Sequence, residues 1–170
     1  MLAGALFGCG AVPSSLGYRG SAVDEPPRMA RVRAQSDAIA AAIRESVERS
    51  STFHALLTTI DATDGLVYVE EGRCGHSVRA CLVLSVKIAG PSRLLRIKVD
   101  PRRRDCQLTA DIGHELQHAI EILRDPHVRD MPSAYSLFER IGPTGSERFE
   151  TREALYAGDR IGDECRNIRR

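Results

Sequence analysis

The run His114-Glu115-Leu116-Gln117-His118 combines two side chains that can bind a metal with one that can move a proton. Residues four apart lie on one face of an α-helix, so the imidazoles of His114 and His118 can reach the same ion. Glu115 projects about 100° away from His114 around that helix, beside the ion rather than onto it. This is the H-E-x-x-H spacing in which two imidazoles bind zinc and a glutamate acts on water. We therefore predict a Zn²⁺ site with His114 and His118 as ligands and Glu115 as the catalytic base.

The residues around the motif predict the helix that carries it. Apolar side chains recur at helical spacing on the side opposite the histidines, at Ile112, Leu116, Ala119, Ile120 and Leu123. We expect this active helix to run from about Leu108 to Leu123, because proline disfavours helical geometry before Asp125-Pro126. The plain alternative is an amphipathic helix with two histidines that face solvent.

A catalytic zinc site normally has three protein ligands and one open position, so a third ligand should follow the motif. The downstream candidates are His127, Glu139, Glu147, Glu150 and Glu153. Glu150 opens a stripe with Ala154, Ala157 and Ile161, and the two small side chains would let this later helix pack close to the active helix. Glu153 lies on a bulkier, more mixed face. We expect Glu150 to be the third ligand, with Glu153 as the next candidate.

Other polar residues are candidates for supporting roles. Tyr135 is the first choice for a donor to the oxyanion that forms on a substrate carbonyl, ahead of Tyr156 and His127. A ligating imidazole usually donates its second N–H to a carboxylate or carbonyl. Asp111 and Asp159 are both candidates for that contact, and the sequence does not choose between them.

The stretch before the active helix has the two-residue period of β-strands. Leu66 to Glu70 is rich in β-forming residues, and residues 82–89 and 95–100 alternate apolar with polar side chains. Gly90-Pro91-Ser92 is the expected turn of a hairpin between the last two strands. The last strand is half polar, as is typical of a sheet edge.

Further helices are expected on either side of these strands. They cover residues 29–50, with a narrow apolar stripe, residues 52–60, residues 133–140 after an N-cap at Ser133, and a last helix that Ser146 caps and that runs to Ile161 or beyond. The sequence thus predicts an α+β fold in which a small, about three-stranded and mostly antiparallel sheet packs against the active helix and the other helices.

Composition limits the class of protein. With 170 residues, 42 % hydrophobic and 28 % charged, the chain fits one globular domain, which we expect over residues 29–170. A net charge of +1 gives no field that would gather nucleic acid. The basic runs Arg102–Arg104 and Arg169–Arg170 are short and lack interleaved aromatic residues. We therefore expect no nucleic-acid partner, and the sequence does not indicate an oligomeric state.

The first 28 residues have two interpretations. Residues 1–11 are apolar or small throughout and resemble the end of a truncated bacterial export signal. Leu6-Phe7-Gly8-Cys9 resembles a loose lipobox, in which Cys9 would carry a lipid anchor. The other interpretation is a flexible tail. Residues 10–28, rich in Gly, Ser and Pro, predict a linker to the folded domain.

The remaining four cysteines are an even number, compatible with disulfides in an oxidising compartment. Cys74 and Cys81 flank a short glycine-containing loop that they can close. Together with the N-terminal segment, these cysteines indicate a location in a bacterial cell envelope, as a periplasmic, lipid-anchored or secreted protein.

These features resemble the gluzincins, zinc metallopeptidases with H-E-x-x-H on one helix and a glutamate ligand on a later one. The run Phe149-Glu150-Thr151-Arg152-Glu153-Ala154 is similar to the glutamate helix of the CAAX prenyl protease and HtpX-like family, whose E-x-x-x-D supplies a ligand and a second carboxylate. The resemblance implies Glu150 as the ligand, and Ala154 stands where that family has aspartate. It also implies that the strand ahead of the active helix, here Leu94 to Val99, pairs with an extended peptide.

The sequence therefore predicts a zinc-dependent endopeptidase that acts on a protein or peptide substrate. Two other hypotheses belong to different classes. One is a zinc-binding structural or adaptor module that has lost turnover, and the other is a metal-free helical binding domain. Nothing in the sequence specifies the substrate or the cleavage preference.

Overall fold

The structure is a computed structural model that describes residues 30–75, 78–142 and 149–167. The N-terminal interpretations, namely the export signal, the lipid anchor at Cys9 and the linker, fall outside these residues. So do Ser146, the expected cap of the last helix, and Glu147, one of the candidate ligands. Within the described residues, no helix has both the length and the hydrophobicity that are needed to cross a membrane.

The described residues form one mixed four-stranded sheet. Its strands are β1 (Val32–Ala34), β2 (Gly65–Glu71), β3 (Ala80–Ala89) and β4 (Ser92–Val99), in the order β1-β2-β4-β3. Strand β2 pairs in parallel with both β1 and β4, and β3 pairs antiparallel with β4. The predicted α+β class is confirmed, but the expected three-stranded, mostly antiparallel sheet is wrong.

The half-polar pattern of β4 predicts an edge strand, and this prediction is wrong. Strand β4 lies in the interior of the sheet, between β2 and β3. Leu95, Ile97 and Val99 are fully buried, whereas Arg96 between them is exposed. The alternation therefore reflects a sheet with one face against the core and one face toward solvent. Strands β1 and β3 form the two edges of the sheet, and β3 is joined to β4 by a hairpin.

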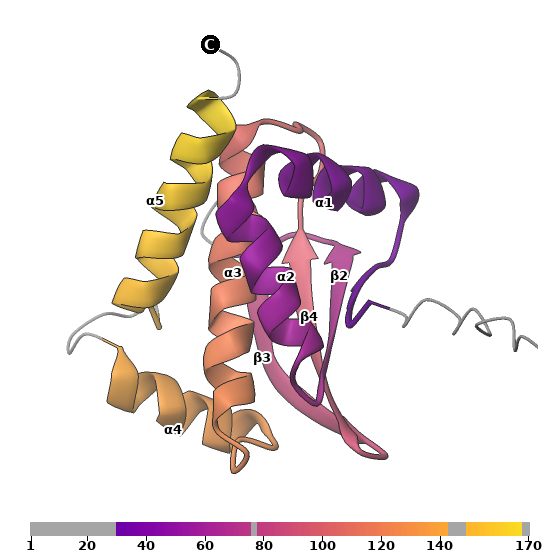
Figure 1. The fold of residues 1–170 in the computed structure, drawn as a ribbon. Helices are drawn as coiled ribbons and strands as arrows, with labels where there is room; N and C mark the ends of the chain where they lie inside the picture. Colours follow the sequence, from indigo (N-terminus) through magenta and orange to yellow (C-terminus); the bar gives the residue numbers. More distant parts are fainter. Residues whose placement is uncertain (1–29, 76–77, 143–148, 168–170) are drawn as a thin grey trace, which may run out of the picture.

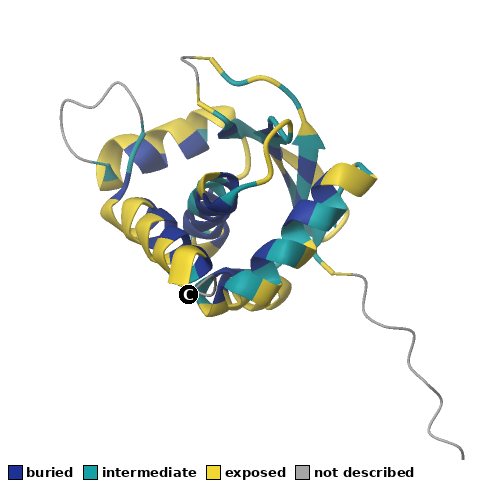
Figure 2. Cartoon of the chain, turned by 90° about the horizontal axis from the view of Figure 1, so that it is seen from above, coloured by how far each residue is buried: buried dark blue, intermediate teal, exposed yellow. Residues whose placement is uncertain are grey.

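Five helices are present in the described part of the chain: α1 (Asp37–Arg49), α2 (Ser51–Asp61), α3 (Cys106–Arg124), α4 (Met131–Ile141) and α5 (Arg152–Asn167). Figure 1 shows α3 in front of the sheet, with α2 and α5 beside it. Viewed from above, α3 occupies the middle of the molecule (Figure 2), and 14 of its 19 residues are buried. The active helix is thus covered on almost all sides, including much of its histidine face.

The starts of the helices explain where two predictions failed. The helix predicted from residue 29 begins only at Asp37, after Ser36 accepts a hydrogen bond from the Ile39 N–H, and β1 takes up part of the preceding stretch. Helix α4 begins earlier than expected, because Asp130 is its N-cap and Ser133 completes a capping box from the third position. The expectation that Ser133 itself caps the helix is wrong.

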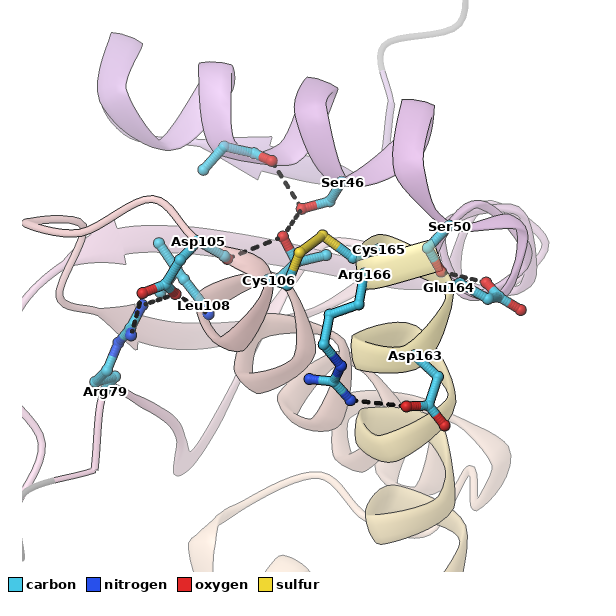
Figure 3. The surroundings of a disulfide bond; sticks show 12 residues. Ser46, Ser50, Arg79, Asp105, Cys106, Leu108, Asp163, Glu164, Cys165 and Arg166 are labelled. Carbon is cyan, nitrogen blue, oxygen red and sulfur yellow. Dashed lines mark hydrogen bonds and ion pairs between the residues drawn. A yellow bond between two sulfur atoms is a disulfide. The ribbon is translucent and has the colours of Figure 1, made fainter. Parts of the chain in front are cut away.

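Small residues let α3 and α5 pack closely. A Cβ on Gly113 would lie 2.2 Å from Cδ1 of Ile161, and one on Gly158 would lie 3.4 Å from Cβ of His114. Ala154 and Ala157 are buried in the same interface, as the stripe on this helix predicted. Cys106, at the start of α3, forms a disulfide with Cys165, near the end of α5 (Figure 3). The two helices are therefore antiparallel and covalently joined at one end.

Candidate metal centre

The structure brings His114, His118 and Glu150 together at one point. Nε2 of His114 lies 3.0 Å from Nε2 of His118 and 3.1 Å from Oε2 of Glu150. One ligand atom from each residue lies within 4.8 Å of the other two. Adjacent donors on a tetrahedral zinc are about 3.3 Å apart, given bonds of about 2.0–2.1 Å. The three side chains are therefore spaced to hold one metal ion.

Glu150 reaches this point from the connection before α5 and not from within the helix. Helix α5 starts at Arg152, and the hydroxyl of Thr151 accepts the N–H of Ala154 at its first turn. Oε2 of Glu150 is buried and accepts no hydrogen bond from the described residues. A buried carboxylate oxygen that accepts no hydrogen bond is costly, and a bound cation removes that cost. Imidazole and carboxylate donors suit zinc, although they also bind other divalent ions.

The other candidate ligands that the structure describes lie away from the two imidazoles. Glu153 is exposed on α5, and Glu139 is exposed on α4. His127 is exposed in the loop after α3, where its backbone N–H donates to Asp125. Among the candidates in the described ranges, the structure thus places Glu150 alone within reach of the histidines.

The surroundings of His114 favour the neutral imidazole that a metal requires. Burial lowers its pKa from the usual 6.5, and the neighbouring His118 lowers it further. The charges of Glu150 and Glu121 and a hydrogen bond to the Ala154 backbone only partly offset these effects. Because His114 is mostly neutral near pH 7, its contact with Glu150 is not a full ion pair, and the ring is suited to metal binding.

His118 is held from behind by a carboxylate that the sequence analysis missed. Its Nδ1 lies 2.8 Å from Oε2 of Glu121, one turn further along α3, and both side chains are buried. The two predicted partners lie elsewhere, since Asp111 accepts a hydrogen bond from Gln107 and Asp159 is exposed. The spacing of three residues between His118 and Glu121 on one helix was a usable signal, because such residues are neighbours.

Glu115 lines the same two cavities as His114 and Glu150. Its Oε2 accepts a hydrogen bond of 2.7 Å from the backbone N–H of Leu82 on the edge strand β3. Burial raises its pKa above the usual 4.5, and the Leu82 N–H and the nearby His118 oppose that rise only in part. A partly buried carboxylate with a raised pKa is well placed to accept a proton and give it up again.

Two cavities meet at the candidate centre, and His114, Glu115 and Glu150 line both. One, of about 210 Å³, is walled mainly by apolar side chains: Val78, Ala80, Leu82, Leu84, Phe138 and Phe149. The other, of about 460 Å³, has a polar wall that includes Arg79, Gln107, Asp111 and Arg166. The centre is thus approachable from two chemically different sides.

Two further site predictions can be placed in the structure. Tyr135 is 46 % exposed on α4, where its ring packs edge-to-face on Phe149 at 4.7 Å, and it lines neither cavity. The strand Leu94 to Val99 belongs to β4, both of whose edges are paired within the sheet. The expectation that this strand pairs with a peptide is therefore wrong, and β3 is the edge strand that borders the centre.

No protein family model matches the chain, and no curated protein or solved structure matches it either. The likeness to gluzincins therefore depends on the motif and on the placement of Glu150. What the fold and the site define is a class: an α+β protein with two histidines and a glutamate spaced to hold a metal ion, beside a buried glutamate and an open cleft.

Proposed function

We propose that the protein is a zinc-dependent endopeptidase. The observation that carries this proposal is the convergence of Glu150 with His114 and His118 while Glu115 lies next to them on the open cleft. Catalytic zinc sites use three protein ligands, such as two imidazoles and one carboxylate, and keep the fourth coordination position open. Structural zinc sites instead use four protein ligands. The alternative, a structural or adaptor module, has no comparable use for Glu115.

Bound zinc would act as a Lewis acid at this centre, polarising a peptide carbonyl and lowering the pKa of water toward about 7. The proton that leaves the attacking water goes to the carboxylate of Glu115, and Glu115 then delivers it to the leaving amine. The Leu82 N–H orients this carboxylate, and burial raises its pKa, which favours transient protonation. Tyr135, the oxyanion donor proposed from the sequence, packs against Phe149, which lines the apolar cavity, and Tyr135 would have to move into that cavity to act.

The cleft suits an extended peptide with an apolar side chain. Among the strands that the structure describes, β3 pairs only with β4, so its other edge lies open beside the centre. Peptides bind to such edges through backbone hydrogen bonds. The N–H of Leu82 is already used by Glu115, so pairing would begin further along the strand, near Leu84. The apolar cavity next to it would take up a side chain of the substrate.

We also propose that the protein works in an oxidising compartment, such as a bacterial envelope. The predicted Cys74–Cys81 disulfide is present, and Cys106–Cys165 is a second one. Disulfides persist in exported proteins and are rare in proteins of reducing compartments. Lipid attachment at Cys9 stays a prediction from the sequence.

The substitution Glu115→Gln tests the proposed reaction, because it removes the proton acceptor and keeps the size of the side chain. We expect hydrolysis of an unfolded protein substrate to fall at least about 100-fold, the usual contribution of general acid–base catalysis. Bound zinc, measured by atomic emission after dialysis, should stay near one per chain. Glu139→Gln, on the exposed face of α4, is the matched control and should retain full activity.

Two results would overturn the proposal. One is a Glu115→Gln variant as active as the unchanged protein. The other is an unchanged protein that holds one zinc per chain but cleaves no unfolded substrate, which would establish the adaptor hypothesis instead. A protein that takes up no metal would favour the metal-free binding domain.

A further inference from the structure

A buried hydrogen-bonded chain connects two of the candidate ligands through residues that do not touch the metal position. Oε2 of Glu121 lies 2.8 Å from Nδ1 of His118, and Oε1 of Glu121 accepts a hydrogen bond of 2.6 Å from the hydroxyl of Thr151. Thr151 directly follows Glu150. Glu121 is 8 % exposed and Thr151 is 1 % exposed, so both side chains depend on protein groups rather than on solvent for their hydrogen bonds.

We infer that Glu121 is the positioning residue of the metal centre. It orients His118 from α3, and through Thr151 it fixes the segment that delivers Glu150. This inference rests on the proposed metal site, but it does not depend on the reaction that the site performs.

The hydrogen-bond partners determine where the protons lie. The Thr151 hydroxyl already accepts the Ala154 N–H, at 3.1 Å, and its single hydrogen is therefore free to go to Glu121. Glu121 thus acts as an acceptor at Oε1, and at Oε2 it accepts the Nδ1–H of His118. That tautomer leaves Nε2 of His118 with a free lone pair, directed at His114 and the metal position.

The two residues just ahead of α5 hold the site together. Oε2 of Glu150 lies 3.1 Å from Nε2 of His114, and the hydroxyl of Thr151 donates a hydrogen bond to Glu121. In the family that the sequence resembles, an aspartate at the position of Ala154 would supply a second carboxylate. Here Glu121 supplies a carboxylate from the opposite helix. A shift of α5 would therefore disturb both imidazoles as well as the carboxylate ligand.

Isosteric substitutions separate this role from a purely structural one. Glu121→Gln keeps the volume of the side chain but leaves His118 without a charged acceptor. Thr151→Val keeps the shape but removes the link to Glu121, whereas Thr151→Ser keeps the hydroxyl. Glu139→Gln on α4 is the exposed control. Each variant is compared as full-length protein, first freed of metal and then titrated.

The two readouts are zinc affinity, measured by competition with a chromophoric chelator, and the visible spectrum of the Co²⁺-loaded protein. We expect Glu121→Gln to weaken zinc binding about 10- to 100-fold, the usual cost of losing such a partner, and to alter the Co²⁺ bands. Thr151→Val should weaken binding, and Thr151→Ser should restore it. Thermal unfolding in the presence of chelator shows whether each variant is folded. If Glu121→Gln is not folded, the comparison of Thr151→Val with Thr151→Ser tests the inference instead.

Unchanged zinc affinity and Co²⁺ spectrum in folded Glu121→Gln would overturn the inference, even if the protein is an active peptidase. Equal affinities of the Val and Ser variants would overturn the link through Thr151. Failure of the proposed function is distinguishable from both, because it appears in the unchanged protein as absence of metal binding or of hydrolysis.

Discussion

At the scale of single residues, Glu150 and Glu153 provide a matched pair. They are three positions apart, but Glu150 lies 3.1 Å from His114 while Glu153 is exposed on α5. We expect Glu150→Ala to weaken zinc binding by more than about 100-fold, because the loss of a ligand costs more than the loss of its supporting partner. Glu153→Ala should bind zinc as the unchanged protein does. Isothermal titration of metal-free protein measures both, and the reverse order would remove Glu150 from the site.

The residues of the site differ in how far the sequence could predict them. His114 and His118 are four apart on one helix, so local geometry alone places them together. Glu150 was found through the small residues that follow it, although it lies just ahead of α5. Glu121 was missed because its role depends on Thr151, which is 30 positions away and meets it only in the folded chain.

At the scale of elements, Glu164 provides a test that depends on pH. This carboxylate on α5 accepts a hydrogen bond from the hydroxyl of Ser50, which Figure 3 shows. It also accepts hydrogen bonds from the hydroxyl and backbone N–H of Thr52, and these contacts tie α5 to the start of α2. Burial raises its pKa, but these hydrogen bonds and one from Arg160 outweigh burial and lower the pKa to about 2, from the usual 4.5. Folding thus stabilises the charged form of Glu164 relative to its protonated form.

A lowered pKa contributes stability that is complete above the unfolded value of 4.5 and is lost as the pH falls toward 2. We expect Glu164→Gln to reduce the free energy of unfolding at pH 7 by roughly 1–2 kcal/mol, the worth of charged hydrogen bonds near the surface. The difference from the unchanged protein should shrink between pH 4.5 and pH 3 in urea titrations. A difference that stays constant over that range would show that charge is not the cause.

The order of the strands was the part of the fold that local patterns predicted least well. Alternation in β4 correctly gave a strand with one buried face, but it carries no information on which strands pair with its two edges. Strand β1 is only three residues long and joins the sheet in parallel beside β2, more than 30 positions later. With only three residues, Val32-Arg33-Ala34 is too short to show the two-residue period of a strand.

At the scale of the whole molecule, the metal centre depends on the α3–α5 pair staying in register. The centre lies near the start of α5, and the Cys106–Cys165 disulfide joins the far end of the same helix to the start of α3. Between them, Gly113 and Ile161 pack without space for another atom. One end is therefore joined by a covalent bond and the other by the ligands, which couples the disulfide to metal binding.

This arrangement predicts unequal effects of the two disulfides. Cys106–Cys165 spans 59 residues and Cys74–Cys81 spans 7. In the chain-entropy account, the longer loop should contribute roughly 4 kcal/mol to the free energy of unfolding and the shorter one roughly 2 kcal/mol. Replacing each pair by serine and unfolding the metal-free proteins in urea tests this order.

Zinc affinity shows whether the Cys106–Cys165 disulfide supports the metal centre in addition to stabilising the fold. Without Cys106–Cys165, α5 can slide or tilt on α3, so the ligands spend less time in the binding arrangement, and the apparent affinity falls in proportion to that fraction. Removing Cys74–Cys81 loosens a wall of the apolar cavity but leaves the α3–α5 pair joined, so zinc should bind nearly as before. Equal zinc affinities in folded samples of the two serine pairs would show that packing alone keeps the centre assembled.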